Sequence, residues 1–100
     1  MKRRPEYQLE VIINERKLSR VIIDQHYRVN HDDSMNDEII LDLVKTLDGK
    51  KFPPEKVQGE FEYFTVEPAY LLEKAYRIVL VLCLTDDYLG VVNAFRVKGK

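Results

Sequence analysis

The chain has 100 residues, of which 45% are hydrophobic and 33% are charged, and its net charge at pH 7 is -1. This composition is typical of one folded domain, residues 1–100, and excludes a disordered chain. The near-neutral charge also excludes nucleic-acid binding through bulk electrostatics, so an RNA site would have to be a local patch.

The sequence indicates a protein of the cytoplasm. The N-terminal "MKRRPEYQ" has charges but lacks the apolar stretch that follows them in a signal peptide. The longest apolar run, "IVLVLCL", has seven residues, far fewer than the roughly 20 of a membrane helix. The single cysteine, Cys83, lies in this run and is typical of a buried core residue. We therefore expect a cytoplasmic location and no membrane partner.

Two segments rich in β-branched residues open the chain. "YQLEVIIN" (7–14) predicts a strand, "NERK" (14–17) a polar turn, and "LSRVIIDQHYRV" (18–29) a second strand. Apolar and polar side chains alternate in the second segment, so one face should pack against the core while the other stays polar. The polar face carries Asp24, His26 and Arg28.

Residues 32–49, "DDSMNDEIILDLVKTLDG", predict an amphipathic helix. Ser34 and Asp37 have the spacing of a capping box, and Gly49 suits the position after the last helical turn. The two prolines that follow prevent the helix from resuming. The apolar stripe of the helix consists of Met35, Ile39, Ile40, Leu43, Val44 and Leu47.

The second half of the chain predicts strands. "FEYFTVE" (61–67), "YRIVLVLCL" (76–84) and "LGVVNAFRV" (89–97) read as strands, and residues 50–60 as a loop. "PAYLLEKA" (68–75) fits either a wide turn or the rest of a hairpin. The order β-β-α-β-β-β predicts an α+β fold, an antiparallel sheet of about five strands with one main α-helix packed on one face.

The turn "TDDY" (85–88) should join the last two strands in a hairpin. This pairing places Leu84 opposite Leu89 and Arg77 opposite Arg96. One face of the hairpin should then form the core beneath the helix, with Asn93 as its polar exception. The residues of this face are Tyr76, Ile78, Leu80, Leu82, Leu84, Leu89, Val91, Phe95 and Val97.

The stretch "HYRVNH" (26–31) holds both histidines of the chain. His26 and His31 point to opposite faces of a strand and diverge on a helix, so they would converge on zinc only if the chain turned at "NHDD". We therefore expect no metal and no cofactor, and we place His31 at a strand-to-helix corner. Cys83 has no basic neighbour in the sequence that would activate its thiol.

These residues suit the cleavage of RNA without a metal ion. The reaction needs proton transfer, which histidine provides near neutral pH, and cations for the phosphate, which arginine provides. His26 and Arg28 share one polar strand face, and Arg77 and Arg96 are expected side by side. An anion between the two arginines would explain their pairing. The alternative is a solvated sheet edge where acidic residues pair with them.

Four stretches resemble small toxins of the BrnT/RelE type: "HYRVNHDDSMNDEIILDLV", "EYF", "YRIVLVL" and "LGVVNAFRV". The resemblance covers about residues 20–97 and implies a ribonuclease that an antitoxin holds in check, or a catalytically inactive relative. The chain departs from such toxins in its slightly acidic charge and in its opening predicted hairpin. The resemblance implies catalytic roles for His26, Arg77 and Arg96. It implies substrate binding by Arg28, Tyr63 and Tyr76.

A non-enzymatic binding or assembly module is the second hypothesis. The near-neutral charge and the lack of an acid-base partner for His26 favour it. An exposed edge at "LEVII" or "LGVVNAF" would invite strand addition or a homodimer. The sequence does not decide between an enzyme with RNA and an antitoxin as partners and a module that binds protein.

Overall fold

The structure is a computed structural model that describes residues 4–28 and 35–97. The described chain forms six strands, one short 3-10 helix and one α-helix. In chain order they are β1 (Glu6–Ile13), β2 (Arg16–Ile23), η1 (Gln25–Tyr27), α2 (Asp37–Thr46), β3 (Lys56–Gln58), β4 (Phe61–Leu71), β5 (Lys74–Cys83) and β6 (Tyr88–Arg96).

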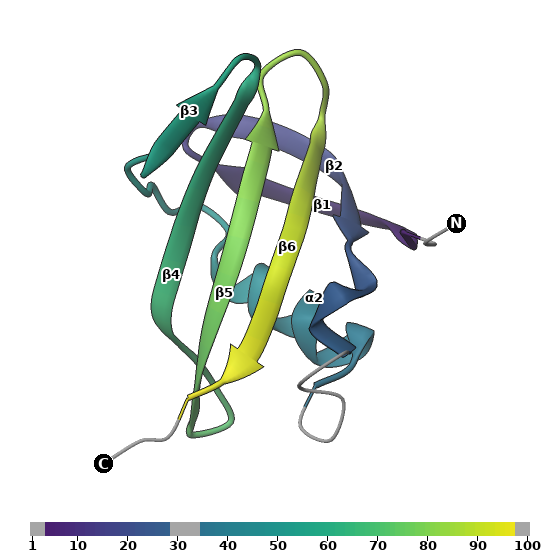
Figure 1. Cartoon of the computed structure of the whole chain (residues 1–100), viewed down its shortest axis with the longest axis vertical. Helices are drawn as coiled ribbons and strands as arrows, with labels where there is room; N and C mark the ends of the chain where they lie inside the picture. Colours follow the sequence, from purple (N-terminus) through teal and green to yellow (C-terminus); the bar gives the residue numbers. More distant parts are fainter. Residues whose placement is uncertain (1–3, 29–34, 98–100) are drawn as a thin grey trace.

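All six strands belong to one sheet in the order β1-β2-β6-β5-β4-β3. β2 and β6 run parallel, and the other neighbours are antiparallel. The sheet curls, so that β1 and β2 pass behind β4, β5 and β6, and α2 lies behind β5 and β6 (Figure 1). The prediction of about five antiparallel strands with a helix packed on one face is therefore wrong. The fold is a mixed, half-barrel-like sheet whose curl encloses a short helix.

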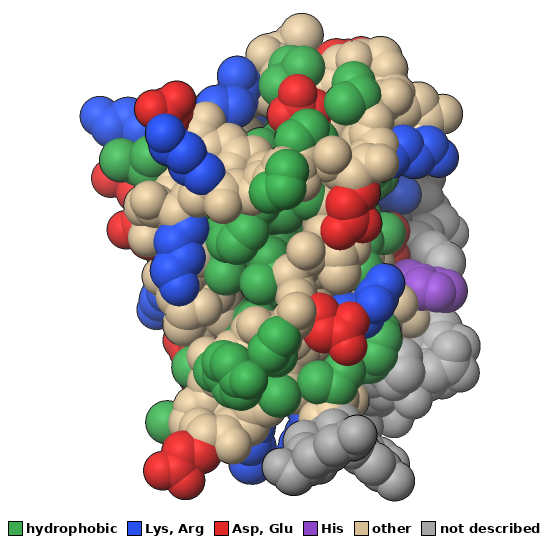
Figure 2. All heavy atoms as spheres, turned by 90° about the vertical axis from the view of Figure 1, so that its left-hand side faces the viewer, with side chains coloured by type: hydrophobic (Ala, Val, Ile, Leu, Met, Phe, Trp, Pro, Cys, Tyr) green, Lys and Arg blue, Asp and Glu red, His purple; other side chains and the backbone are tan. Residues whose placement is uncertain are grey.

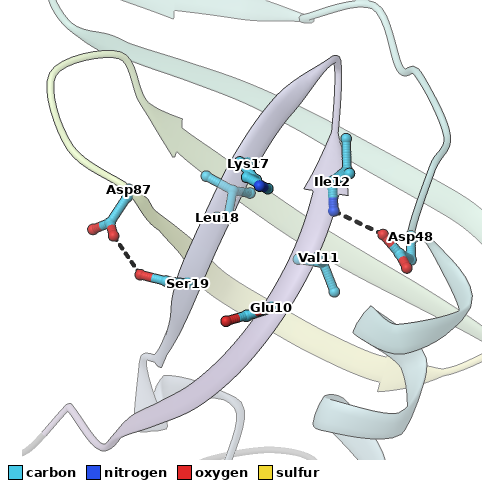
Figure 3. A pocket seen from close by; sticks show the side chains of 8 residues that line it. All are labelled: Glu10, Val11, Ile12, Lys17, Leu18, Ser19, Asp48 and Asp87. Atoms are coloured by element: carbon cyan, nitrogen blue, oxygen red, sulfur yellow. Dashed lines mark hydrogen bonds between the residues drawn. The ribbon is translucent and has the colours of Figure 1, made fainter.

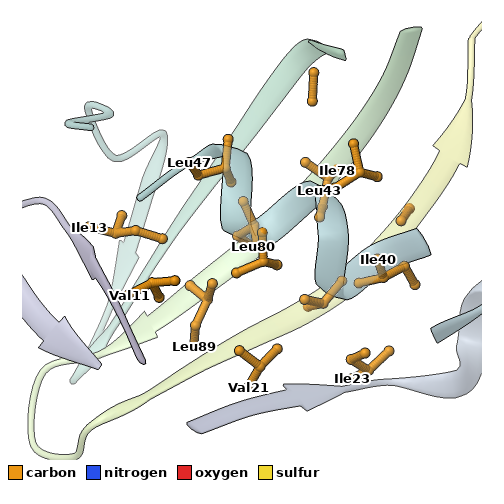
Figure 4. Packing of buried hydrophobic residues seen from close by; sticks show 14 of the residues in the cluster. Val11, Ile13, Val21, Ile23, Ile40, Leu43, Leu47, Ile78, Leu80 and Leu89 are labelled. Atoms are coloured by element: carbon orange, nitrogen blue, oxygen red, sulfur yellow. The ribbon is translucent and has the colours of Figure 1, made fainter. Parts of the chain in front are cut away.

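The core lies between α2 and the inner face of the sheet. Leu43 of α2 and Leu47, which caps its C-terminal end, are buried beside Ile78 and Leu80 of β5, and β1 closes the cluster with Ile13 among others (Figure 4). The predicted apolar stripe of the helix is confirmed, because all its members are buried except Ile39, which is partly buried. Burying this stripe together with the strands supplies the main hydrophobic stabilisation of the fold.

The α-helix is shorter than the predicted 32–49. Asn36 caps it, with its side chain accepting a hydrogen bond from the Ile39 backbone N–H at 2.8 Å. The cap predicted at Ser34 falls outside the described residues. The helix ends at Thr46, and Gly49 then takes a φ of 83°, which favours glycine.

The second strand ends earlier than the predicted 18–29. β2 stops at Ile23, because the Asp24 carboxylate accepts a hydrogen bond from the His26 backbone N–H at 2.8 Å and turns the chain into η1. The turn buries Tyr27 completely and leaves His26 exposed. His26 and Arg28 therefore lie on a turn and do not share a strand face.

The predicted pairing of the last hairpin is also wrong. Val79 lies opposite Asn93 and Leu80 opposite Val91, so Val92 is an extra residue in a β-bulge. Leu82 lies opposite Leu89, and Leu84 belongs to an open loop.

Because the bulge reverses the alternation of side chains, the core face holds Ala94 in place of Phe95, and Asn93 leaves it. The members of the predicted core face that are confirmed as buried are Tyr76, Ile78, Leu80, Leu82, Leu89 and Val91.

Residues 68–75, which the sequence left open, complete a hairpin. β4 continues to Leu71, and Leu72 and Glu73 form its two-residue turn into β5. The segment 50–60, expected to be a loop, contains the short edge strand β3. Tyr70 on β4 and Leu72 in the turn after it are exposed hydrophobic residues. Figure 2 shows hydrophobic side chains on the side of the molecule that carries β3 and β4.

No helix in residues 4–28 and 35–97 is both long enough and apolar enough to cross a membrane.

Candidate functional site

The predicted site residues lie on three parts of the fold. His26 and Arg28 are exposed at η1, Arg77 and Arg96 lie on β5 and at the end of β6, and Tyr63 is half-buried on β4. The sixth residue, Tyr76, is a core residue with only 4% of its surface exposed. The fold therefore does not gather all six residues at one site.

Arg77 and Arg96 point to opposite faces of the sheet. Arg77 lies opposite Phe95, and Arg96 lies opposite Tyr76. Facing residues share a sheet face and successive residues alternate, so the predicted side-by-side pair does not exist. Arg77 instead donates a hydrogen bond of 2.7 Å to the Glu67 carboxylate on β4. A bound anion is not needed to explain its position.

The turn that carries His26 is tied to the sheet. The Asp24 backbone N–H donates to the Val91 carbonyl of β6 at 2.9 Å, and the Asp24 side chain caps η1. Arg28 lies over the ring of Tyr27, with its guanidinium carbon 5.3 Å from the ring centroid. These contacts fix the backbone on both sides of His26, so its exposed imidazole is carried by a well-defined turn.

A buried carboxylate joins this turn to the helix and to β1. Asp37, whose side chain is 14% exposed, accepts hydrogen bonds from the hydroxyls of Tyr7, at 2.6 Å, and Tyr27. The amide of Gln25 donates to it at 3.2 Å, and the Arg28 guanidinium lies 3.8 Å away. We call these five residues the Asp37 cluster.

The cluster shifts the titration of its members in opposite directions. Burial alone would raise the pKa of Asp37, but the hydrogen bonds from the tyrosines and the glutamine and the nearby arginine charge lower it below 3.8. Burial, followed by the hydrogen bond to Asp37, raises the pKa of the Tyr27 hydroxyl. The hydrogen bond to Asp37 raises the pKa of the Tyr7 hydroxyl as well. At neutral pH the cluster is therefore an anion held by neutral phenols and one cation.

A shallow depression on the side of the sheet away from α2 lies next to this turn. Its volume is about 280 Å³. Its floor is made of small or β-branched residues of β5 and β6, and Asp24 and Arg4 stand at one end. We call it the outer groove. Its lining includes the side chains of Phe61, Tyr63, Val81, Tyr88, Asp24 and Arg4.

Gly90 keeps the floor of the outer groove flat. A Cβ atom at this position would lie 2.5 Å from the Cγ1 atom of Val81 on the facing strand. Carbon atoms in contact are normally 3.5 to 4.0 Å apart, so any side chain here would force Val81 to move. The rings of Tyr63 and Tyr88 line the depression, and the Val81 side chain covers Gly90 on its floor.

A larger cavity of about 420 Å³ lies beside the β1–β2 hairpin (Figure 3). Two hydrogen bonds join residues that line it. The Ser19 hydroxyl donates to Asp87, and the Ile12 backbone N–H donates to Asp48 at 2.7 Å. The hydrogen bonds from Ser19 and then from Arg20 lower the pKa of Asp87 to about 2. These contacts fasten β1 and β2 to the helix end and to the β5–β6 turn, which makes this cavity a structural junction.

Among residues 4–28 and 35–97, no group of three or more His, Cys, Asp or Glu side chains is arranged to hold a metal ion. His31, the second histidine of the predicted pair, is outside the described residues.

Comparison of the chain with protein-family models, with curated proteins and with solved structures found no match. The resemblance to BrnT/RelE-type toxins therefore stays a prediction.

Sequence reasoning missed the outer groove, although it named Tyr63 and found the neighbouring turn residues. The groove depends on the parallel pairing of β2 with β6, which brings Ile22 beside Gly90. The one local signal was the glycine inside a strand of apolar residues, a pattern that often marks a close approach of a ligand or another backbone.

Proposed function

We propose that the protein binds single-stranded RNA in the outer groove and cleaves it without a metal ion, with His26 as the group that transfers the proton. The observation that supports this best is the position of an aromatic groove next to the Asp24 turn that carries His26. The sequence resemblance implies the same class of reaction. The cytoplasm is the proposed place of action, and an antitoxin covering the groove is the proposed protein partner.

The groove offers what unpaired RNA bases need. Proteins recognise single-stranded RNA by stacking splayed bases on aromatic rings, often on the open face of a β-sheet. Here Phe61, Tyr63 and Tyr88 line the depression, and Gly90 lets the Val81 side chain pack closely against its floor. Burial raises the pKa of the Tyr88 hydroxyl, so this side chain is neutral at physiological pH. A stacked base would therefore meet uncharged rings.

The proposed chemistry needs few groups. His26 takes the proton from a ribose 2′-hydroxyl, and the 2′-oxygen attacks phosphorus while the bond to the 5′-oxygen breaks. The departing 5′-oxygen takes a proton from water, and the imidazole returns its proton to the solvent. The products are a 2′,3′-cyclic phosphate and a free 5′-hydroxyl end. Arg28, at the same turn, is the proposed cation for the phosphate. Because the net charge of the chain is only -1, we expect stacking to contribute more to binding than phosphate contacts do.

A matched pair of tyrosines on β4 tests the binding site. Tyr63 lines the outer groove, whereas Tyr70 lies outside it and is 65% exposed. Loss of one stacked base costs about tenfold or more in affinity. We therefore expect Tyr63→Ser to weaken binding of a fluorescein-labelled single-stranded RNA, measured by anisotropy, while Tyr70→Ser leaves it unchanged. Equal effects of the two substitutions, or no binding by the unaltered chain, would refute the proposal.

Strand addition, the alternative hypothesis, was expected at two sheet edges, and one of them is not free. β6 is paired on both sides along Tyr88–Val91, so "LGVVNAF" is not a free edge over that stretch. β1 does lie at the end of the sheet, but a register shift between Gln8 and Val11 interrupts it and its last residues bond to the chain after α2. Bulges of this kind discourage edge-to-edge pairing. The geometry therefore favours the groove over the edge.

A further inference from the structure

We infer that the outer groove selects bases that carry an exocyclic amino group, cytosine above uracil, through the carboxylate of Asp24. The inference rests on the proposed function, because it names the base that the RNA site prefers. It concerns the hydrogen-bonding groups at one end of the groove, which stacking on the tyrosines does not involve.

Among residues 4–28 and 35–97, the contacts of the Asp24 carboxylate leave part of its capacity to accept hydrogen bonds unused. Its Oδ1 atom accepts from the His26 backbone N–H at 2.8 Å, and its Oδ2 atom lies 3.6 Å from Nε of Arg4. Each carboxylate oxygen has two lone-pair positions, so each can accept a further bond. The side chain is 25% exposed and lines the groove, which makes this remaining capacity accessible to a ligand.

The two charged residues give this end of the groove a fixed polarity. An ionised aspartate only accepts hydrogen bonds, and an arginine only donates them. The other side chains at the groove that can form hydrogen bonds, Tyr63 and Tyr88, carry hydroxyls that both donate and accept, so they discriminate little between bases. Asp24, with Arg4 beside it, is therefore the side chain that discriminates between bases.

Cytosine matches this polarity and uracil does not. Cytosine presents an amino donor next to a ring-nitrogen acceptor, and acidic side chains recognise its amino group in known nucleic-acid complexes. Uracil has the reverse order, a carbonyl oxygen in place of the amino group and an N–H in place of the ring-nitrogen acceptor. In the orientation of a bound cytosine, its oxygen would face the lone pairs of the carboxylate and its N–H would face a donor. Since both bases are single-ring pyrimidines of similar size, stacking alone would not separate them.

The experiment compares the binding of oligocytidylate and oligouridylate by anisotropy. Both probes carry 2′-O-methyl groups, because these block attack by the 2′-oxygen and keep the RNA intact. We expect the unaltered chain to bind the cytosine oligonucleotide about tenfold more tightly. Asp24→Asn should remove this preference, because an amide also offers a donor to the uracil carbonyl. Asparagine is as good a helix cap as aspartate, so the turn should be kept.

Asp42→Asn, on α2, is the matched control, because it makes the same chemical change away from the groove and should leave the preference intact. Equal binding of both oligonucleotides by the unaltered chain would overturn the inference and leave the proposed function standing. A cytosine preference that survives Asp24→Asn would overturn the role of Asp24. Binding of neither oligonucleotide would overturn the proposed function, and the inference would fall with it.

Discussion

Asp37 is the side chain that joins β1, η1 and the start of α2. Its carboxylate binds the hydroxyl of Tyr7, 30 positions earlier in the sequence, and that of Tyr27, 10 positions earlier. Through these bonds it holds β1, η1 and the start of α2 together. The turn that carries His26 is therefore held from one side by Asp24 and from the other by the Asp37 cluster.

Substitution of Asp37 by asparagine should destabilise the fold at neutral pH. Each tyrosine hydroxyl would lose a charged acceptor in a largely buried place, so we expect the free energy of unfolding to fall by about 1–3 kcal/mol. Unfolding in urea, followed by circular dichroism, measures this loss. Asp42→Asn, whose side chain is 48% exposed, serves as the control and should change little.

The loss of stability in Asp37→Asn should depend on pH, because the pKa of Asp37 is lowered in the folded chain and the pKa values of its two tyrosine partners are raised. The pKa of Asp37 is lowered from 3.8, so its contribution is complete above that value and disappears as the pH falls through its folded-state pKa. The pKa values of Tyr7 and Tyr27 are raised from 10.0, so their contribution disappears as the pH rises above that value. The stability difference between the two chains should thus be greatest between these limits. A difference that does not change with pH would contradict this account.

The role of Asp37 could be predicted only in part. Its place in the first turn of a helix follows from the acidic start and the apolar stripe, and both features are present. Its tyrosine partners could not be predicted, because nothing in the sequence indicates that Tyr7 and Tyr27 approach the same helix end. Local sequence patterns predict the helix, whereas the contacts of a largely buried polar group depend on the tertiary structure.

At the level of elements, one extra residue in β6, Val92, removes the arginine pair that the sequence predicted. The strands 76–84 and 89–97 were predicted correctly in kind, and most of their inward residues are buried as expected. The bulge at Val92 was not predicted, although Asn93, the polar exception on the expected core face, was a sign of it. It separates Arg77 from Arg96 and moves Asn93 off the core face. A bulge therefore removed the predicted arginine pair while leaving the strand predictions intact.

The hairpin between β4 and β5 has a strained turn. Leu72 and Glu73 have φ values of 51° and 67°, which large side chains rarely adopt, and Leu72 is 85% exposed. Two-residue turns of this shape favour Asn-Gly. The double substitution Leu72→Asn with Glu73→Gly should therefore raise the free energy of unfolding by about 1 kcal/mol, as measured in urea.

The matched control for this turn acts in the opposite direction. Gly59 has a φ of 61°, and a Cβ atom there would meet nothing within 4 Å, so Gly59→Ala tests the backbone conformation alone. We expect it to lower the free energy of unfolding by about 1 kcal/mol. If the double substitution at the β4–β5 turn lowered stability too, strain at Leu72 and Glu73 would not be the explanation.

At the level of the whole molecule, the parallel pairing of β2 with β6 creates both the curl of the sheet and the outer groove. This pairing joins segments about 70 residues apart, Arg20 with Tyr88 and Val21 with Leu89 among them. Sequence periodicity identifies strands and their buried faces, but it does not say which distant strands become neighbours. For this reason the elements were largely predictable and the sheet was not.

The candidate site was likewise predictable in its individual residues but not in its arrangement. His26, Arg28 and Tyr63 were named from the sequence; Tyr63 lines the groove, and His26 and Arg28 belong to the turn that follows Asp24, itself a lining residue. Asp24 was seen only as part of a polar strand face, and Gly90 only as a small residue. Their roles depend on the close approach of β6 to the turn after β2. The hydrogen bond from the Asp24 backbone N–H to the Val91 carbonyl joins these two segments.

The most direct test of the central claim is the cleavage of an end-labelled single-stranded RNA in the presence of EDTA, with the unaltered chain and His26→Ala prepared in parallel. His26 is exposed and its bond to Asp24 uses the backbone, so the variant should fold. We predict cleavage to a 2′,3′-cyclic phosphate by the unaltered chain and a loss of about 100-fold or more in the variant. Intact RNA after incubation with the folded, unaltered chain, or equal cleavage by His26→Ala, would contradict the account.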